Sequence, residues 1–329
     1  MLASPLAAQE PSPAPITSRF PLTGSPPTVA LVLSGGSAKA FAHIGVLKVV
    51  EQVGLPVDLV TGTSMGGIVG GLYAIGYTPA MLERVALGTD WDGVFQGAAR
   101  RDQLRPAQKL GDGRWVLTFP IRGGRVRLPA GLVPRQRVDD VLTRLTWSVP
   151  DARDFRAFPI PFAAVATDLE TGESVRLDHG VLSDALQASM ALPGVFAPMK
   201  LDGHSYVDGG VARNLPAQDA RDMGATVVVC VDVSDPLLPA DSLESAADVL
   251  LQTITFQMQR SNEAQRKLCD VLITPDITGL PATSFTKAAV WIARGEAAAE
   301  AVRPRLREIA DSVRALRGGS GSEVAGRGL

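Results

Sequence analysis

Short apolar runs alternate along this chain with longer segments whose apolar residues recur every three or four positions. The short runs predict buried strands, and the longer periodic segments predict helices. Strands are expected at 28–34, 57–63, 161–167, 226–233 and 270–274, with a hairpin over 114–128. Helices are expected at 39–53, 65–76, 79–88, 135–145, 181–191, 215–223, 243–266 and 285–315. This alternation predicts an α/β fold with a mostly parallel central sheet covered by helices on both faces.

The composition of the chain fits one large globular domain. Its 329 residues are 46% hydrophobic and 20% charged, enough apolar material for a full α/β core. The formal net charge of −2 gives no electrostatic basis for binding nucleic acid. Every apolar run is shorter than the roughly 18 residues of a transmembrane helix. Cys230 and Cys269 fit two buried thiols better than a disulfide, and their spacing offers no metal site.

The first segment that carries chemistry is Gly62-Thr-Ser-Met-Gly66, between a predicted strand and a predicted helix. This is the sequence form of a nucleophile elbow, a tight turn that exposes the hydroxyl of Ser64. Gly62 and Gly66 occupy positions where a Cβ would crowd the turn. The amide of Met65 would lie at a helix N-terminus, directed to where an oxyanion forms. Gly-x-Ser-x-Gly also occurs in glycine-rich loops, but its position here favours the elbow.

A second strand–turn–helix unit lies upstream, at Ser34-Gly-Gly-Ser-Ala-Lys39. Free backbone N–H groups are expected at its helix start, where they would bind an anion. One interpretation is a nucleotide-binding loop, but neither Gly-x-Gly-x-x-Gly nor Gly-Lys-Ser/Thr is present. The other is that the amides stabilise the oxyanion of an acyl-transfer intermediate, with Lys39 adding positive charge. The second interpretation is favoured because one strand–turn–helix unit supplies N–H donors and the other supplies Ser64.

A third candidate segment is Asp208-Gly-Gly210, which ends a short apolar run. Asp-Gly is commonly a surface turn, and taken alone this is the simpler interpretation. The preceding residues 189–198 are small and apolar, which indicates a packed approach to a site rather than an exposed turn. Asp208 is therefore a candidate site residue.

Taken in order, these motifs resemble those of patatin-like phospholipases, and in particular the bacterial branch with the secreted patatin domains of outer-membrane autotransporters. The matching segments are Leu33–Ala40, Ala42–Leu47, Gly62–Gly66, Val165–Gly172, Ala188–Phe196, Asp208–Gly210 and Asn214–Pro216. The resemblance covers about residues 28 to 300. It implies a three-layer α/β/α fold around a mostly parallel central sheet.

The resemblance implies a lipid acyl hydrolase with a Ser–Asp dyad. Ser64 would be the nucleophile and Asp208 the proton acceptor, and fatty acyl esters of phospholipids or related lipids would be cleaved through an acyl-enzyme. The oxyanion-hole amides would be those of Gly35, Gly36, Ser37 and Ala38, together with Met65. The residues that support the motifs would be Lys39, Gly62, Gly66, Gly209 and Gly210. No metal and no cofactor are implied.

The first motif departs from the family's usual Gly-Gly-Gly-x-Arg/Lys-Gly, because Ser37 and Ala40 replace two glycines. If residue 37 has to adopt φ > 0, a serine costs on the order of 1 kcal/mol relative to glycine. The backbone N–H survives the change, so activity is expected, in attenuated form. A catalytically weak or silent lipid-binding domain is the alternative.

The rival catalytic arrangement is a Ser–His–Asp triad on an α/β-hydrolase fold. His43 lies in an apolar helix, which favours a packed histidine. His179 lies in a predicted turn, and His204 most simply at a hairpin tip. A Ser–Asp dyad requires a raised pKa at Asp208, because a carboxylate with a pKa near ~3.9 is a weak base toward an alcohol. We expect burial of Asp208 to raise that pKa.

Both ends of the chain have the composition of linkers. Residues 1–27 are expected to form a flexible, Pro-rich segment that resembles the end of a signal peptide, with an ordinary disordered terminus as the alternative. Residues 28–315 would form the catalytic domain, and 316–329 a flexible tail. These features favour a periplasmic or secreted location over a cytoplasmic one.

The predicted helix 243–266 carries several apolar residues along its length. The ordinary interpretation is that they pack against the sheet. A lipid hydrolase could also use them to line an acyl channel, to contact a membrane peripherally or to form a homodimer. The sequence leaves these uses open.

Overall fold

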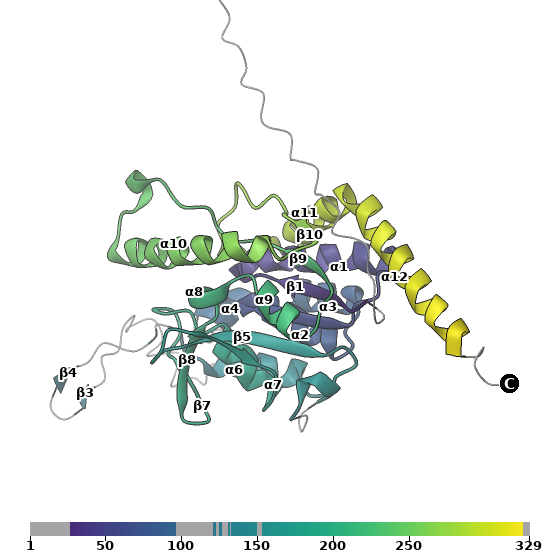
Figure 1. The fold of residues 1–329 in the computed structure, drawn as a ribbon. Helices are drawn as coiled ribbons and strands as arrows, with labels where there is room; N and C mark the ends of the chain where they lie inside the picture. Colours follow the sequence, from purple (N-terminus) through teal and green to yellow (C-terminus); the bar gives the residue numbers. More distant parts are fainter. Residues whose placement is uncertain are drawn as a thin grey trace, which may run out of the picture.

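The computed structural model describes residues 27–96, 121–122, 125–126, 131, 133–149 and 153–324. One mixed, mostly parallel sheet forms the centre, with helices on both of its faces (Figure 1). Its strands run in the order β10-β9-β1-β2-β5-β8-β7, and β6 pairs with β5. The parallel strands are β1 (Val29–Leu33), β2 (Leu59–Thr63), β5 (Phe162–Asp168), β9 (Val227–Val231) and β10 (Val271–Ile273). These confirm the predicted strands and the α/β fold.

The antiparallel part of the sheet was expected only as a hairpin near His204. It consists of β6 (Ser174–Leu177), β7 (Met199–Leu201) and β8 (His204–Asp208). The turn between β7 and β8 holds Asp202 and Gly203, so the hairpin expected there is confirmed. A separate pair, β3 (Ile121–Arg122) and β4 (Arg125–Val126), matches the centre of the predicted hairpin 114–128. The rest of that prediction, like residues 1–26, lies outside the described residues.

The predicted helices are found close to their expected positions. Those before β5 are α1 (Ala42–Gln52), α2 (Ser64–Ala74), α3 (Pro79–Gly88), α4 (Trp91–Gln96) and α6 (Gln136–Leu145). Those after it are α7 (Leu182–Ser189), α8 (Gly210–Arg213), α9 (Ala217–Asp222), α10 (Ala246–Arg266), α11 (Ala288–Ala301) and α12 (Arg303–Val324). Of these, α4 and α8 are found in addition to the predicted helices. Short 3-10 helices include η1 (Ser37–Phe41) and η4 (Phe285–Lys287). None of the described helices is both long and apolar enough to cross a bilayer.

The C-terminal prediction needs two corrections. The single helix expected at 285–315 is divided at Val302 into α11 and α12. Pro304 is the second residue of α12, and a proline without an N–H is tolerated in the first turn of a helix but not in its interior. In addition, α12 continues to Val324, so residues 316–324 are helical rather than a flexible tail. The last five residues lie outside the described part of the chain.

Alternating side chains of the central strands fill two cores, one on each face of the sheet. On β1, Val29, Leu31 and Leu33 belong to the larger core, under α1, α2, α7 and α11. Ala30 and Val32 face the smaller core, under α9. Because successive side chains of a strand point to opposite faces, a strand buried on both sides is a continuous apolar run. This is why these strands could be recognised in the sequence.

Helix α11 lies against α1, where two glycines allow the backbones to meet. A Cβ on Gly45 would lie 2.0 Å from the carbonyl oxygen of Ile292. A Cβ on Gly295 would lie 1.8 Å from that of Ala42. Any larger residue at either position would force the helices apart. Their contact holds α1 in place over the sheet, and α1 follows directly on η1, which forms one wall of the candidate site.

The two ends of the described fold are joined by one arginine. Arg317 of α12 donates a hydrogen bond of 2.7 Å to the carbonyl oxygen of Pro27, and its guanidinium also pairs with Asp58. The carboxylate of Asp58 accepts a further bond of 2.7 Å from the amide of Val29, at the start of β1. The C-terminal helix is thereby attached to the first strand.

The expectation of two free thiols is wrong, because Cys230 and Cys269 form a disulfide. Cys230 lies on β9, and Cys269 lies just before β10, the parallel neighbour of β9. That pairing brings the two Cα atoms to 5.8 Å, which is within the usual range for a disulfide. The spacing in the sequence could not show this, since it depends on which strands are neighbours.

Reducing this disulfide should destabilise the fold. The bridge closes a loop across a sequence separation of 39 residues, for which chain entropy predicts a stabilisation of about 4 kcal/mol. We expect urea unfolding of the wild type to shift to lower urea when a reductant is present. The double variant Cys230→Ala/Cys269→Ala should unfold at the same urea concentration with and without reductant. Equal midpoints for oxidised and reduced wild type would contradict the prediction.

Candidate active site

Strand β5 brings together the ends of β2 and β8, the two strands that carry the candidate site residues. Its residue Val165 pairs with Thr63, the last residue of β2, and the next residue, Ala166, pairs with Asp208, the last residue of β8. Because β6 occupies the other edge of β5 at these residues, β2 and β8 share one edge. They approach it from opposite directions. Ser64, which follows Thr63, therefore lies beside Asp208.

Ser64 lies at a strained strand-to-helix turn, as the sequence predicted. Its φ is 54°, a left-handed conformation that is rare outside glycine and typical of a nucleophile elbow. A Cβ on Gly66 would lie 2.3 Å from the carbonyl oxygen of Ser34, so the turn and the neighbouring loop can meet only with a glycine there. The amide of Ser64 donates a hydrogen bond of 2.8 Å to Oγ of Ser189. Backbone and packing thus hold the serine in place.

The side chain of Asp208 is buried, with 3% of its surface exposed. Its Oδ2 accepts a hydrogen bond of 2.7 Å from Oγ of Ser64, and its Oδ1 accepts one of 2.7 Å from the amide of Gly210. Burial raises the pKa of Asp208 to about 6, although both hydrogen bonds favour the charged form. Asp208 ends a strand and Gly210 begins α8, so the simpler interpretation as an exposed surface turn is wrong.

Two of the amides expected to face an oxyanion are already engaged. The N–H of Gly35 donates to the carbonyl oxygen of Asn214 at 3.2 Å, and that of Ala38 donates to Ala282 at 3.0 Å. Within the described residues, the N–H groups of Gly36, Ser37 and Met65 have no hydrogen-bond partner. The expectation is therefore wrong for Gly35 and Ala38, whereas Gly36, Ser37 and Met65 have free donors.

Ser37 has the conformation that the missing glycine would have favoured. Its φ is 52°, one of three positive values among the described non-glycine residues. Lys39, two residues later, is buried at 1% exposure and forms an ion pair with Asp235. Burial lowers the pKa of Lys39, and the carboxylate of Asp235 opposes that shift. The positive charge that Lys39 was expected to add to the oxyanion site is thus partly neutralised by Asp235.

All three histidines have partners other than Ser64. His43 is buried, burial lowers its pKa to about 4, and its Nε2–H donates to the carbonyl oxygen of Ser34 at 2.8 Å. His179 pairs with Asp178. His204 lies 3.0 Å from Asp168, with its side chain largely exposed. The arrangement gives no support to a Ser–His–Asp triad, since the partner of the Ser64 hydroxyl is a carboxylate.

Two residues that hold the site were not identified from the sequence as site residues. Ser189 accepts the amide of Ser64 and donates from its own Oγ to the carbonyl oxygen of Val165 at 2.6 Å. Asn214, which is fully buried, donates from Nδ2 to the carbonyl oxygen of Gly35 at 3.3 Å. Both belong to segments of the family resemblance, but a single sequence does not show which polar residue of a segment faces inward.

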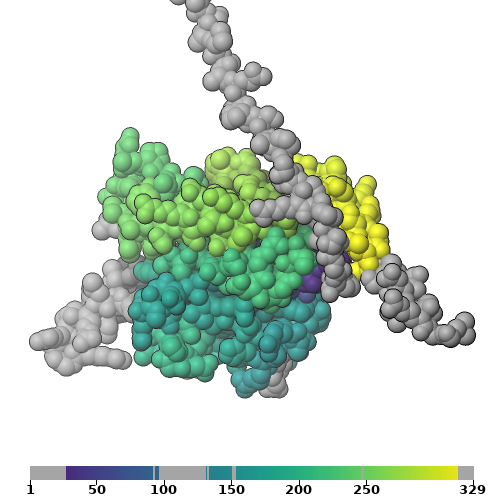
Figure 2. Space-filling view, in the orientation of Figure 1, coloured from purple at the N-terminus to yellow at the C-terminus, as the bar shows by residue number. Residues whose placement is uncertain are grey.

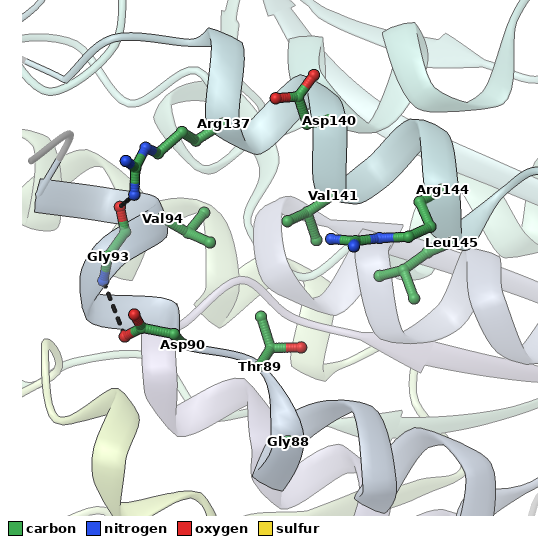
Figure 3. Close-up of a pocket in the computed structure, with 10 residues that line it drawn as sticks. All are labelled: Gly88, Thr89, Asp90, Gly93, Val94, Arg137, Asp140, Val141, Arg144 and Leu145. Atoms are coloured by element: carbon green, nitrogen blue, oxygen red, sulfur yellow. Dashed lines mark hydrogen bonds between the residues drawn. The ribbon is translucent and has the colours of Figure 1, made fainter. Parts of the chain in front are cut away.

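A separate cavity of about 530 Å³ lies between α3, α4 and α6 (Figure 3). Arg137 crosses its edge and donates to the carbonyl oxygen of Gly93 at 3.0 Å, and Arg144 and Asp140 also line it. The cavity contains neither Ser64 nor Asp208, so it is not the site built by β5. No group of three or more His, Cys, Asp or Glu side chains in the described ranges could hold a metal ion.

A profile of patatin-like phospholipases matches residues 31–221 of the chain, more than half of its length. The chain belongs to the patatin-like phospholipase family. Over 215 residues it is 35% identical to patatin-like phospholipase domain-containing protein 6 of Mus musculus, an alignment that covers 64% of this chain and 14% of that protein. Over 222 residues it is 32% identical to an uncharacterized NTE family protein of Mycobacterium bovis, covering 68% and 53% respectively.

The patatin-like chain spans about half, or less, of the length of these curated relatives. Among solved structures, VipD from Legionella pneumophila is similar, with a TM-score of 0.44 and 14% identity over 87% of this chain and 67% of that one. The family match extends over the strands β1, β2, β5 and β8, which carry the site described above.

Replacing Ser37 by glycine should stabilise this patatin-like fold. A left-handed conformation costs a residue with a Cβ about 1–2 kcal/mol, and glycine avoids that cost at the price of a more flexible unfolded chain. We expect Ser37→Gly to raise the free energy of unfolding by about 1 kcal/mol, measured in urea. Ser37→Ala keeps the Cβ and should give no such gain. If Ser37→Gly is no more stable than Ser37→Ala, the left-handed conformation of residue 37 does not destabilise the fold, and the prediction is contradicted.

Asp208→Asn should stabilise the protein at high pH. The pKa of Asp208 rises from 3.8 to about 6 on folding, so between those values the folded state binds more protons and loses stability as pH rises. At pH 8 the asparagine should add roughly 2–3 kcal/mol, and little at pH 4.

Asp168 provides the opposite control for this measurement. Amide hydrogen bonds from Thr171 and Glu170 lower its pKa, so Asp168→Asn should destabilise the protein at pH 8. If the difference in stability between Asp208→Asn and wild type does not change with pH, the raised pKa of the buried Asp208 carboxyl is contradicted.

Proposed function

We propose that the chain is a serine acyl hydrolase that cleaves fatty acyl esters of phospholipids or related lipids. Ser64 is the nucleophile and Asp208 its proton acceptor. The observation that carries the proposal is the 2.7 Å hydrogen bond from Oγ of Ser64 to the buried carboxylate of Asp208. Membership in the patatin-like phospholipase family supports a lipid ester as the substrate.

In the first half of the reaction, Oγ of Ser64 attacks the carbonyl carbon of the ester while its proton passes to Oδ2 of Asp208. The pKa of about 6 suits this step, because the carboxylate is a stronger base than a free aspartate and is still ionised at pH 7. The carbonyl π electrons move to oxygen and form a tetrahedral oxyanion. When the intermediate collapses, the alcohol leaves with the proton from Asp208, and the acyl group stays on Ser64.

In the second half, water attacks the acyl-enzyme along the same path. Asp208 takes a proton from the water, and the second tetrahedral intermediate expels Oγ of Ser64, which recovers that proton. The fatty acid is released and the dyad is restored. One carboxylate thus acts as base and then as acid in each half, as microscopic reversibility requires.

The free amides of Gly36, Ser37 and Met65 are proposed to stabilise the oxyanion. Preorganised N–H donors typically supply the largest share of such catalysis, and losing one costs about 100–1000-fold in rate. The position of Ser37 supports this assignment, since as the first residue of η1 its N–H has no acceptor within that helix. With a serine rather than a glycine, the left-handed conformation of residue 37 is strained, and the strain is consistent with an attenuated rate.

We also propose that the protein works in an oxidising compartment, such as the periplasm or the extracellular space. The support is the Cys230–Cys269 disulfide, because structural disulfides persist in such compartments and are rare in the reducing cytosol.

A fluorophosphonate probe tests the mechanism directly. We expect one covalent adduct, on Ser64, with a rate that rises about tenfold per pH unit up to about pH 6 and is constant above it, because Asp208 must be ionised. Ser64→Ala should abolish the adduct. Asp208→Asn should slow labelling by about 100–10,000-fold.

His204→Ala is the control that separates the dyad from a triad, and it should leave labelling and ester turnover nearly unchanged. A large loss of turnover in that variant would contradict the dyad. Mass spectrometry of the labelled wild type shows where the adduct lies. Folded protein without an adduct would show instead a silent lipid-binding domain.

A further inference from the structure

The first half of helix α10 exposes large apolar side chains. Val249 is 52% exposed, and the side chains of Leu250, Leu251 and Phe256 are between 41% and 49% exposed. An amphipathic helix normally buries its apolar face against the core. The most buried side chains of α10 are instead polar: those of Gln252, Asn262 and Gln265 are each at most 8% exposed. This corrects the expectation that these four apolar residues of α10 pack on the sheet.

The inward polar face is fixed by specific hydrogen bonds. The amide side chain of Gln252 both donates to and accepts from the backbone of Leu238, at 2.9 and 3.2 Å. Ser261 donates to the carbonyl oxygen of Ala212 in α8 at 2.9 Å. Asn262 donates to Oγ of Ser234 at 2.6 Å. Rotating or displacing the helix would leave these polar groups unpaired, which is unfavourable. The hydrogen bonds therefore hold the helix in the position that exposes these apolar side chains.

The same hydrogen bonds connect α10 to the candidate active site. Oγ of Ser234, which accepts from Asn262, also accepts from Asn214 at 2.7 Å, and Asn214 in turn donates to Gly35. Cε of Met258 would lie 2.5 Å from a Cβ on Gly210, the residue whose amide binds Asp208. The helix thus lies against α8 and is linked to Gly35 through Ser234 and Asn214. Figure 1 shows α8 beneath α10.

The exposed part of α10 borders the approach to the site. A Cβ on Gly194 would lie 3.9 Å from Cδ2 of Leu250, and Gly194 belongs to the segment whose Ala191 accepts the amide of Asp208. Figure 2 shows α10 as a light-green band on the surface of the molecule. Residues 249–258 contain no charged side chain, and the nearest charged residues of the helix are Asp248, engaged in the N-terminal capping box, and Arg260.

We propose that Val249, Leu250, Leu251 and Phe256, here called the outer face of α10, form with Leu237 and Leu238 the surface through which the enzyme docks on a lipid aggregate; this rests on the function proposed above. Its uncharged, apolar character matches the acyl-chain region of a bilayer or micelle rather than a charged headgroup layer. Helices that bind at an interface insert apolar side chains of this kind in the lipid, and here the buried polar side chains hold the helix on the protein. Docking would place the lipid surface beside the site that cleaves it.

The area of the patch argues against a second copy of the chain as the occupant. Fully burying a side chain of this kind removes about 60–120 Å² of apolar surface. The six side chains are 41–53% exposed, so together they present roughly 150–380 Å² of apolar surface. A stable dimer buries about 800 Å² on each partner, of which about 450–520 Å² is apolar. The patch is too small for that but is enough for a reversible contact with lipid.

The test compares two double variants of the full chain in binding to uncharged phosphatidylcholine vesicles by co-sedimentation. Leu250→Gln/Phe256→Gln changes the outer face of α10. Leu87→Gln/Val290→Gln changes exposed apolar side chains of α3 and α11, at 55% and 39%, and serves as the matched control. All forms carry Ser64→Ala in this assay so that the vesicles stay intact. Near-ultraviolet circular dichroism checks folding, and Val249→Gln/Leu251→Gln gives a second outer-face pair.

We expect the outer-face variants to lower the partition coefficient by about 10–100-fold, and the control variant to leave it unchanged. Binding should vary little with salt, because the contact is apolar. In the forms with Ser64 intact, hydrolysis of vesicle lipid should fall by the same factor, while hydrolysis of a water-soluble short-chain ester stays unchanged.

Equal partition of the outer-face variants and wild type would overturn the proposal. So would sedimentation velocity in which the wild type is a dimer and the outer-face variants are monomers with unchanged vesicle binding, because a second copy would then cover the face. Failure of the proposed function is a separate result: without a fluorophosphonate adduct on Ser64, the partition of the variants would still decide whether α10 binds lipid.

Discussion

The candidate site depends on one constraint, the sharing of a single edge of β5 by two strands that run in opposite directions. The last residue of β2 and the last residue of β8 pair with consecutive residues of β5, which places the hydroxyl of Ser64 against the carboxylate of Asp208. A slip of β8 by one residue would turn that carboxylate to the other face of the sheet. The hydrogen bond between the two side chains is therefore a property of sheet register as much as of the residues themselves.

Burial has two opposite effects in this arrangement. Excluding water from Asp208 makes the carboxylate a stronger base, and it also makes the charged form less stable in the folded protein. The backbone at Ser37 and Ser64 has a similar conflict, because both residues of the candidate site adopt a left-handed conformation that a serine does not favour. The well-packed sheet around these residues supplies the stability that they lack.

Much of this structure could be predicted from the sequence because it depends on local patterns. The buried strands appear as apolar runs, and the turn at Ser64 has its own signature. What could not be predicted depends on partners distant in the chain. The amides of Gly35 and Ala38 are engaged by residues 214 and 282, and the disulfide depends on β9 and β10 being neighbours. The exposure of apolar side chains on α10 depends on hydrogen bonds to α8 and to the loop after β9.

The attachment of Arg317 to Pro27 has a mechanical consequence. It anchors α12 at one corner of the fold, at the start of β1, while Ser64 follows the opposite end of the neighbouring strand, about 16 Å away along five residues. A pull on α12 or on the segment before β1 would therefore act at that corner and not on the dyad.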